Sequence, residues 1–173
     1  MSNIKLPLFI LNDQGTCDFS DIAKMLYNKS EQYLVINGNS FCNSAFDTAY
    51  LRNEWLKVCL EISQKIGLPI VINASLTPDN LKNLENAKLF SHIYYISTVS
   101  SNELFNQRYD ELNIQNSDWR KSAKLSNEYL QAYAKTEYPE MKLINIGESS
   151  LCEIANQIDE YILECINNER FNC

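Results

Sequence analysis

Four arginines are the side chains of this chain best suited to hold an anionic ligand. They are Arg52, Arg108, Arg120 and Arg170, in a sequence of 173 residues. A guanidinium makes paired hydrogen bonds to phosphates and carboxylates, so these positions are candidates for binding an anionic small molecule. The alternative is that they pair with the 22 acidic residues, which give the chain a formal net charge of −7.

A second polar set lies in the segment after the first apolar run. Residues 12–18 read Asn-Asp-Gln-Gly-Thr-Cys-Asp and connect that run to a predicted helix. Backbone amides in such a loop can bind an anion, which makes Asp13, Gly15, Cys17 and Asp18 candidate ligand-binding residues. Cys17 precedes a helix N-terminus, where a thiolate is stabilised. The two aspartates oppose its ionisation, so an inert structural thiol is the favoured interpretation.

Cysteine and histidine usage argues against a metal site. The six cysteines form no CxxC pair, and His92 is the single histidine. Zinc sites need a cluster of such ligands, so we expect no metal. We interpret His92 as a packed residue at a strand end and the thiols as reduced, as in a cytoplasmic protein.

The charge and the apolar runs exclude several partners. A net charge of −7 is unlike the basic surface of a duplex-binding protein and opposes docking on an anionic membrane. The apolar run 6–11 is far too short to span a bilayer. We therefore expect neither nucleic acid nor a membrane as a partner.

Short apolar runs alternate with helical patterns along the whole chain. The predicted strands cover residues 6–11, 33–36, 68–72, 92–96 and 143–146. The predicted helices cover residues 19–28, 44–65, a short stretch after Thr77, 102–110, 118–135 and 150–167. Continuous apolar strands separated by helices imply a parallel sheet covered on both faces. The predicted fold class is α/β, a three-layer α/β/α sandwich with a five-stranded parallel sheet, in a single domain over residues 1–173.

Two details of these helices are open to direct test. The long helix is expected to end at Gly67 and to bury one face, made of Leu51, Trp55, Val58, Cys59 and Ile62. The polar segment 167–173 is expected to be frayed.

The order of these elements resembles the small P-loop nucleoside and nucleotide kinases, including the shikimate- and gluconate-kinase-like types. The first strand runs straight into a loop and a helix at P-loop spacing. Asn37-Gly38-Asn39 stands where such kinases often have Asp-x-Asp, and residues 51–56 resemble an LRxxWL helix. Residues 67–72 resemble a G-x-P-V-V strand, residues 102–108 the helix leading into a kinase lid, and residues 118–120 the end of that lid.

The resemblance also implies that the usual phosphate-binding residues are missing. In the pattern GxxxxGK[ST], Asn12 and Cys17 replace the glycines, Asp18 replaces the lysine and Phe19 replaces the Ser/Thr. A carboxylate in place of the lysine repels phosphates, and phenylalanine cannot bind magnesium.

Two amides stand where the family pattern has acids. Asn37 and Asn39 replace two aspartates that would hold the metal or activate the acceptor hydroxyl, and an amide is a poor base. Three of the arginines, Arg52, Arg108 and Arg120, fall at positions that resemble substrate or lid arginines.

These features predict a catalytically degenerate kinase-like protein that binds an anionic small molecule, such as a nucleotide, or a protein partner. No cofactor is expected. The alternative is an active small-molecule or nucleoside phosphotransferase, which would use ATP and Mg²⁺ with an unconventional phosphate loop. The carboxylates Asp47, Glu54 and Asp110 are possible bases, and the sequence does not select among them.

Overall fold

Five strands form one sheet in which every neighbouring pair is parallel. The computed structural model describes residues 5–12, 19–29, 31–37, 48–74, 76–111 and 117–171, without the side chains of 19, 20, 37, 117, 119, 170 and 171. The strands are β1 (Leu8–Asn12), β2 (Leu34–Asn37), β3 (Ile70–Asn73), β4 (Ile93–Val99) and β5 (Met141–Asn145). Their order in the sheet is β2-β3-β1-β4-β5.

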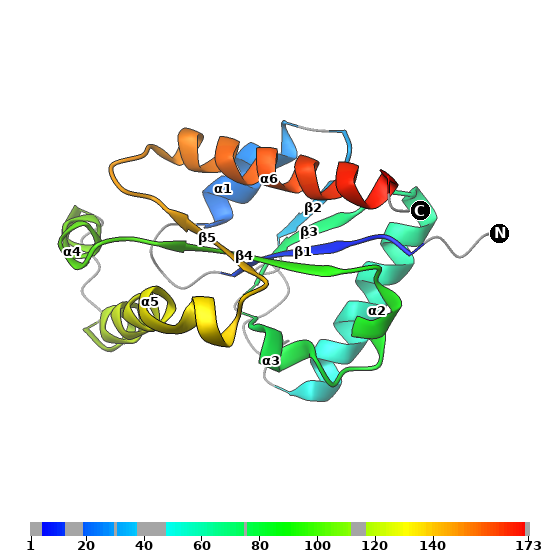
Figure 1. The fold of residues 1–173 in the computed structure, drawn as a ribbon, viewed down its shortest axis with the longest axis horizontal. Helices are drawn as coiled ribbons and strands as arrows, with labels where there is room; N and C mark the ends of the chain where they lie inside the picture. The colour runs from blue at the N-terminus through cyan, green and yellow to red at the C-terminus, as the bar shows by residue number, and fades with distance from the viewer. Residues whose placement is uncertain are drawn as a thin grey trace.

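Helices cover both faces of this sheet (Figure 1). They are α1 (Phe19–Tyr27), α2 (Ala49–Ile66), α3 (Pro78–Leu81), the 3-10 turn η2 (Asn86–Leu89), α4 (Asn102–Glu111), α5 (Ser117–Glu137) and α6 (Leu151–Phe171). Figure 1 shows α1 and α6 on one face and α2, α3 and α5 on the other. The predicted three-layer α/β/α sandwich with a five-stranded parallel sheet is confirmed.

The central strand β1 shows why both faces must be covered. All five of its residues are buried, and successive side chains point to opposite faces. Leu8 and Ile10 belong to the core under α2 and α5, whereas Phe9 and Leu11 belong to the core under α1 and α6. A strand that is apolar on both faces is stable only between two helical layers.

Four of the five strands end later than the apolar runs predicted, and β5 ends one residue earlier, at Asn145. Asn12, Asn37 and Asn73 each close a strand, and β4 continues through Ser97 and Thr98 to Val99. Strand ends are set by the backbone ladder, and the ladder includes polar pairs such as Asn12 with Ser97. The apolar pattern by itself therefore placed the carboxyl ends of β1, β2, β3 and β4 too early.

The predicted face of α2 was wrong in part. Leu51 and Val58 are 39% and 48% exposed, whereas the helix buries Trp55, Leu56, Cys59, Leu60 and Ser63. The sequence offers two adjacent apolar rows, and contacts with η2 and α3 select between them. The predicted end at Gly67 is confirmed, because Gly67 caps the helix with φ 73°. Residues 44–47 of the predicted helix lie outside the described residues.

The last helix is longer than expected, so the predicted frayed segment was wrong for residues 167–171, and residues 172 and 173 lie outside the described residues. α6 continues to Phe171. Glu169 holds its last turn, since its carboxylate accepts hydrogen bonds from Ser91 Oγ at 2.5 Å and Tyr94 OH at 3.0 Å.

Within the described ranges, none of the helices is long and apolar enough to cross a membrane.

The α2 face can be tested with two substitutions on one helix. Leu56→Ala is expected to lower the free energy of unfolding by about 2–5 kcal/mol, because it leaves a cavity in the core. The control Val58→Ala removes exposed carbons and is expected to change it by no more than about 0.5 kcal/mol. Urea denaturation of both variants measures the difference, and equal losses would contradict the observed orientation of α2.

Candidate functional site

The carboxyl edge of the central strands is the expected place for a ligand. β1 lies between β3 and β4. From β1 the chain crosses to β2, which lies on the β3 side of β1. From β3 it crosses to β4, on the opposite side of β1. Ligands of open parallel sheets bind where the strand order reverses in this way. The carboxyl ends of β1, β3 and β4 therefore frame the candidate site.

Buried polar side chains gather at this edge. Each is at most 1% exposed, and together they are Asn12, Asn73, Ser97, Thr98, Ser100 and Asn127. In the part of the chain that the structure describes, these buried groups are amides and hydroxyls, with no carboxylate or cation among them. The buried polar groups described at this edge are therefore uncharged.

One amide side chain fastens α5 to the end of β4. Asn127 Oδ1 accepts a hydrogen bond from the Ser100 backbone N at 3.0 Å, and Asn127 Nδ2 donates to the Ser100 carbonyl at 2.8 Å. Gln131 Nε2 donates to the same carbonyl at 2.9 Å. The neighbouring strand ends are also joined, since Ser97 Oγ donates to the Asn12 carbonyl at 3.1 Å. The side chain of Asn127 thus hydrogen-bonds the Ser100 backbone N–H and carbonyl as a neighbouring strand would.

Sequence reasoning named Asn12 only as a replacement for a glycine of the P-loop pattern, and it missed this polar set. The available signal was a polar residue directly after an apolar run, as at Asn73 after Ile72 and at Ser97 after Ile96. For Asn127 no local signal existed, because a single asparagine in a helix is usually solvated.

Two of the predicted ligand arginines are engaged inside the protein. Arg108 Nη2 donates to the Ser149 carbonyl at 3.0 Å. Arg120 Nη1 lies 2.6 Å from Asp110 Oδ1, and its guanidinium lies over the Tyr109 ring at 5.7 Å. The predicted alternative, pairing with acids, applies to Arg120, and it makes Asp110 an ion-pair partner.

The structure describes only some of the remaining predicted ligand-binding residues. Arg52 lies half-buried in the first turn of α2, and Asn37 closes β2 opposite Asn73 of β3. Asp13, Gly15, Cys17, Asp18 and Asn39 lie outside the described residues, as does Asp47. Their part in a ligand site stays a prediction.

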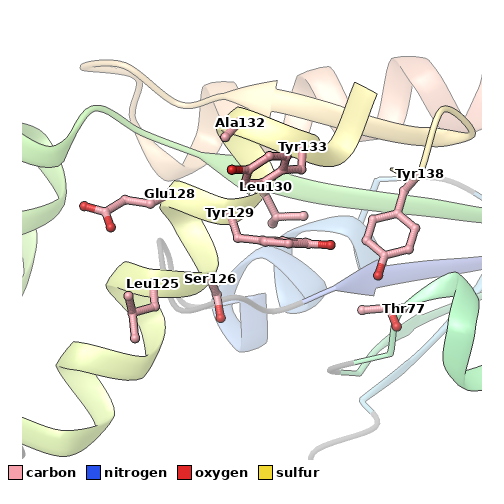
Figure 2. Close-up of a pocket in the computed structure, with 9 residues that line it drawn as sticks. All are labelled: Thr77, Leu125, Ser126, Glu128, Tyr129, Leu130, Ala132, Tyr133 and Tyr138. Atoms are coloured by element: carbon pink, nitrogen blue, oxygen red, sulfur yellow. The ribbon is translucent and has the colours of Figure 1, made fainter. Parts of the chain in front are cut away.

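A cavity that the sequence did not reveal lies beside α5. Its volume is about 650 Å³, and Figure 2 shows α5 on one side and Thr77 with Tyr138 on the other. The residues that line it are Thr77, Leu125, Ser126, Glu128, Tyr129, Leu130, Ala132, Tyr133 and Tyr138. Leu125, Tyr129 and Tyr133 recur every four residues, a pattern that the sequence would assign to a core-facing stripe, yet all three are exposed.

Two of the described thiols are buried, and the histidine lies away from this edge. Cys59 and Cys165 are buried thiols, and burial raises the pKa of each. His92 precedes β4 at the opposite end of the sheet and packs against Tyr94, with ring centroids 4.2 Å apart. Among the described residues, no three side chains of His, Cys, Asp or Glu come together as metal ligands would.

Comparison with known proteins identifies the fold. No protein-family model matches the sequence, and no curated protein matches it. A gluconokinase from Sinorhizobium meliloti 1021 has a similar structure, with a TM-score of 0.60 and 12% identity over 97% of this chain and 96% of that chain. A protein from Eubacterium ventriosum ATCC 27560, described only as uncharacterized, follows with a TM-score of 0.53 and 12% identity over 93% of this chain and 99% of that chain.

A thymidylate kinase from Candida albicans is more distant, with a TM-score of 0.46 and 12% identity over 92% of each chain. The first of these likenesses confirms the predicted resemblance at the level of the fold: the chain has a P-loop-kinase-like fold.

Removing the amide that fastens α5 to β4 tests the geometry of this edge. Asn127→Ala leaves the Ser100 N–H without its acceptor, and we expect unfolding to require about 1–3 kcal/mol less free energy. Amide hydrogen exchange at Ser100 is expected to become faster. The control Asn102→Ala removes an exposed amide bonded to Glu128 and is expected to change neither quantity. An unchanged Ser100 exchange rate in Asn127→Ala would show that this contact does not hold the strand end.

Proposed function

We propose that this protein is a catalytically degenerate P-loop-kinase-like protein, which binds a small molecule or a protein partner and transfers no phosphoryl group. The observation that supports this most is the uncharged carboxyl edge, where the buried polar groups of the described chain are amides and hydroxyls. Phosphoryl transfer depends on placing cations and carboxylates around the transferred group. Neutral groups at this edge stabilise that charge poorly.

The sequence of the phosphate-loop segment supports the same proposal. Asp18 stands at the position of the phosphate-binding lysine and Phe19 at that of the metal-binding hydroxyl. Asn37 and Asn39 stand at the positions of the two acids. The proposal therefore needs neither ATP nor Mg²⁺ as a cofactor.

The arginines limit which anionic ligands fit this proposal. Arg108 and Arg120 would have to give up their contacts with Ser149 and Asp110 to bind a ligand. Arg52, in the first turn of α2, stays a predicted candidate as well. The proposal places the protein in the cytoplasm, where the free thiols Cys59, Cys152 and Cys165 would stay reduced.

A thermal-shift titration with ATP, with and without Mg²⁺, tests the proposal. A ligand that binds only the native state raises the melting temperature. We expect no Mg²⁺-dependent shift and no release of phosphate from ATP by the full chain. A Mg²⁺-dependent shift accompanied by phosphoryl transfer would establish the active phosphotransferase instead.

A charge reversal tests whether Asp18 weakens nucleotide binding. Asp18→Lys removes the repelling carboxylate and restores a cation, so ATP is expected to raise the melting temperature of this variant more than that of the native chain. Glu31→Lys makes the same change in charge before β2 and serves as the control. Equal responses of the two variants to ATP would show that residue 18 does not face the nucleotide.

A further inference from the structure

Three hydroxyl groups on the walls of the cavity beside α5 have already donated their protons. Tyr138 OH donates to Asp79 Oδ2 at 3.0 Å, and Thr77 Oγ1 donates to Asn80 Oδ1 at 3.1 Å. Tyr129 OH donates to a carboxylate oxygen of Glu137. A hydroxyl has one proton, so toward a ligand these three oxygens can only accept. A ligand that meets them must supply hydrogen-bond donors.

The walls of the cavity contain no cation among the described residues. Two lysines have acidic partners here: Lys82 Nζ lies 2.6 Å from Asp79 Oδ1, and Lys124 Nζ lies 3.9 Å from Glu128 Oε1. The charge of Glu137 is shared only with the Tyr129 hydroxyl in the contacts described. An anionic ligand would therefore meet acceptors and negative charge, which repel it.

Aromatic rings supply the rest of the surface. The ring centroids of Tyr129 and Tyr133 are 5.4 Å apart, and those of Tyr129 and Tyr138 are 6.5 Å apart. Tyr129 and Tyr133 are 37% and 51% exposed, so their rings are open to a ligand. The face of an aromatic ring attracts a cation, and a phenol that donates to a carboxylate has a more electron-rich ring.

The walls are held in place without a ligand. The bond from Tyr138 to Asp79 joins the segment after α5 to the start of α3. Thr77 is fixed at the same place, because its backbone N donates to Asn80 Oδ1 at 2.9 Å. Figure 2 shows the Tyr129 side chain extending from α5 toward Tyr138 and Thr77. A volume of about 650 Å³ between such walls suits a small organic molecule.

We propose that this cavity binds a small organic cation, namely a protonated primary amine carried on an apolar or aromatic body. The ammonium donates to the oxygens of Tyr129 and Tyr138, and the body packs on Leu125, Leu130 and the Tyr133 ring. This site takes its ligand whether or not the chain binds nucleotide, because its chemistry is the opposite of that of a phosphate site.

Three probes of similar shape and different charge test the proposal by isothermal titration calorimetry on the full chain. They are phenethylammonium, the neutral 2-phenylethanol and the anionic 3-phenylpropanoate. We expect phenethylammonium to bind with a dissociation constant of about 1 mM or below and at least about fivefold more tightly than 2-phenylethanol, with no binding of 3-phenylpropanoate. Equal affinity for the cation and the alcohol, or no saturable binding of the cation, would overturn the proposal.

Substitutions locate the bound cation. Tyr133→Leu removes a ring and Tyr138→Phe removes an acceptor oxygen, and each is expected to weaken phenethylammonium binding about fivefold or more. The control Tyr27→Leu changes a tyrosine that is 66% exposed on α1, on the other face of the sheet, and should leave binding unchanged. Melting temperatures of the three variants show that each is folded. Binding that survives both cavity substitutions would place the cation elsewhere and refute the proposed site.

A titration of the same samples with ATP and Mg²⁺ separates this proposal from the previous one. Binding of the amine together with an active phosphotransferase would refute only the proposed loss of catalysis. Absence of both amine and ATP binding would refute only the cation site.

Discussion

The parallel pairing of β1 with both β3 and β4 is the constraint on which the rest of this structure depends. β1 is buried along its whole length, with alternate side chains in the two cores. Both faces must therefore be covered by helices, and the polar backbone groups of the sheet are exposed to other chemistry only at its edges and ends. The carboxyl ends of the central strands are where the chain gathers its buried polar side chains.

Burial also explains why the buried polar groups described at that edge are uncharged. An amide or hydroxyl can be buried at little cost when it is hydrogen-bonded, as Asn127 is to Ser100, whereas an unpaired charge in the same place would be strongly destabilising. An active P-loop kinase needs charged groups beside its phosphates. Amides at the strand ends favour a stable edge over charge stabilisation, which is the physical basis of the proposed loss of phosphoryl transfer.

The two sides of α5 have different chemistry. On its inner side, Arg120 holds Asp110 of α4 and stacks on Tyr109, which packs with Phe105 and Ala123 in a small separate core. Its cation is thereby used to join two helices. On its outer side, Tyr129 and Tyr138 donate their hydroxyl protons to Glu137 and Asp79. Arg108 and Arg120 are engaged within the fold, whereas the cavity presents acceptors and aromatic rings.

The sequence by itself determined the order of the elements, the α/β class and the end of α2 at Gly67, because these depend on local periodicity and on a glycine that adopts a positive φ. The sequence also named the positions that depart from the P-loop pattern. The part of Asp18 and its neighbours in a ligand site stays a prediction. Only the tertiary structure decided which row of α2 is buried, which partners hold Arg108 and Arg120, and that Thr77 and Tyr138 meet α5 around a cavity. Those outcomes depend on contacts between residues far apart in the chain, and no local pattern records which distant side chain will supply the partner.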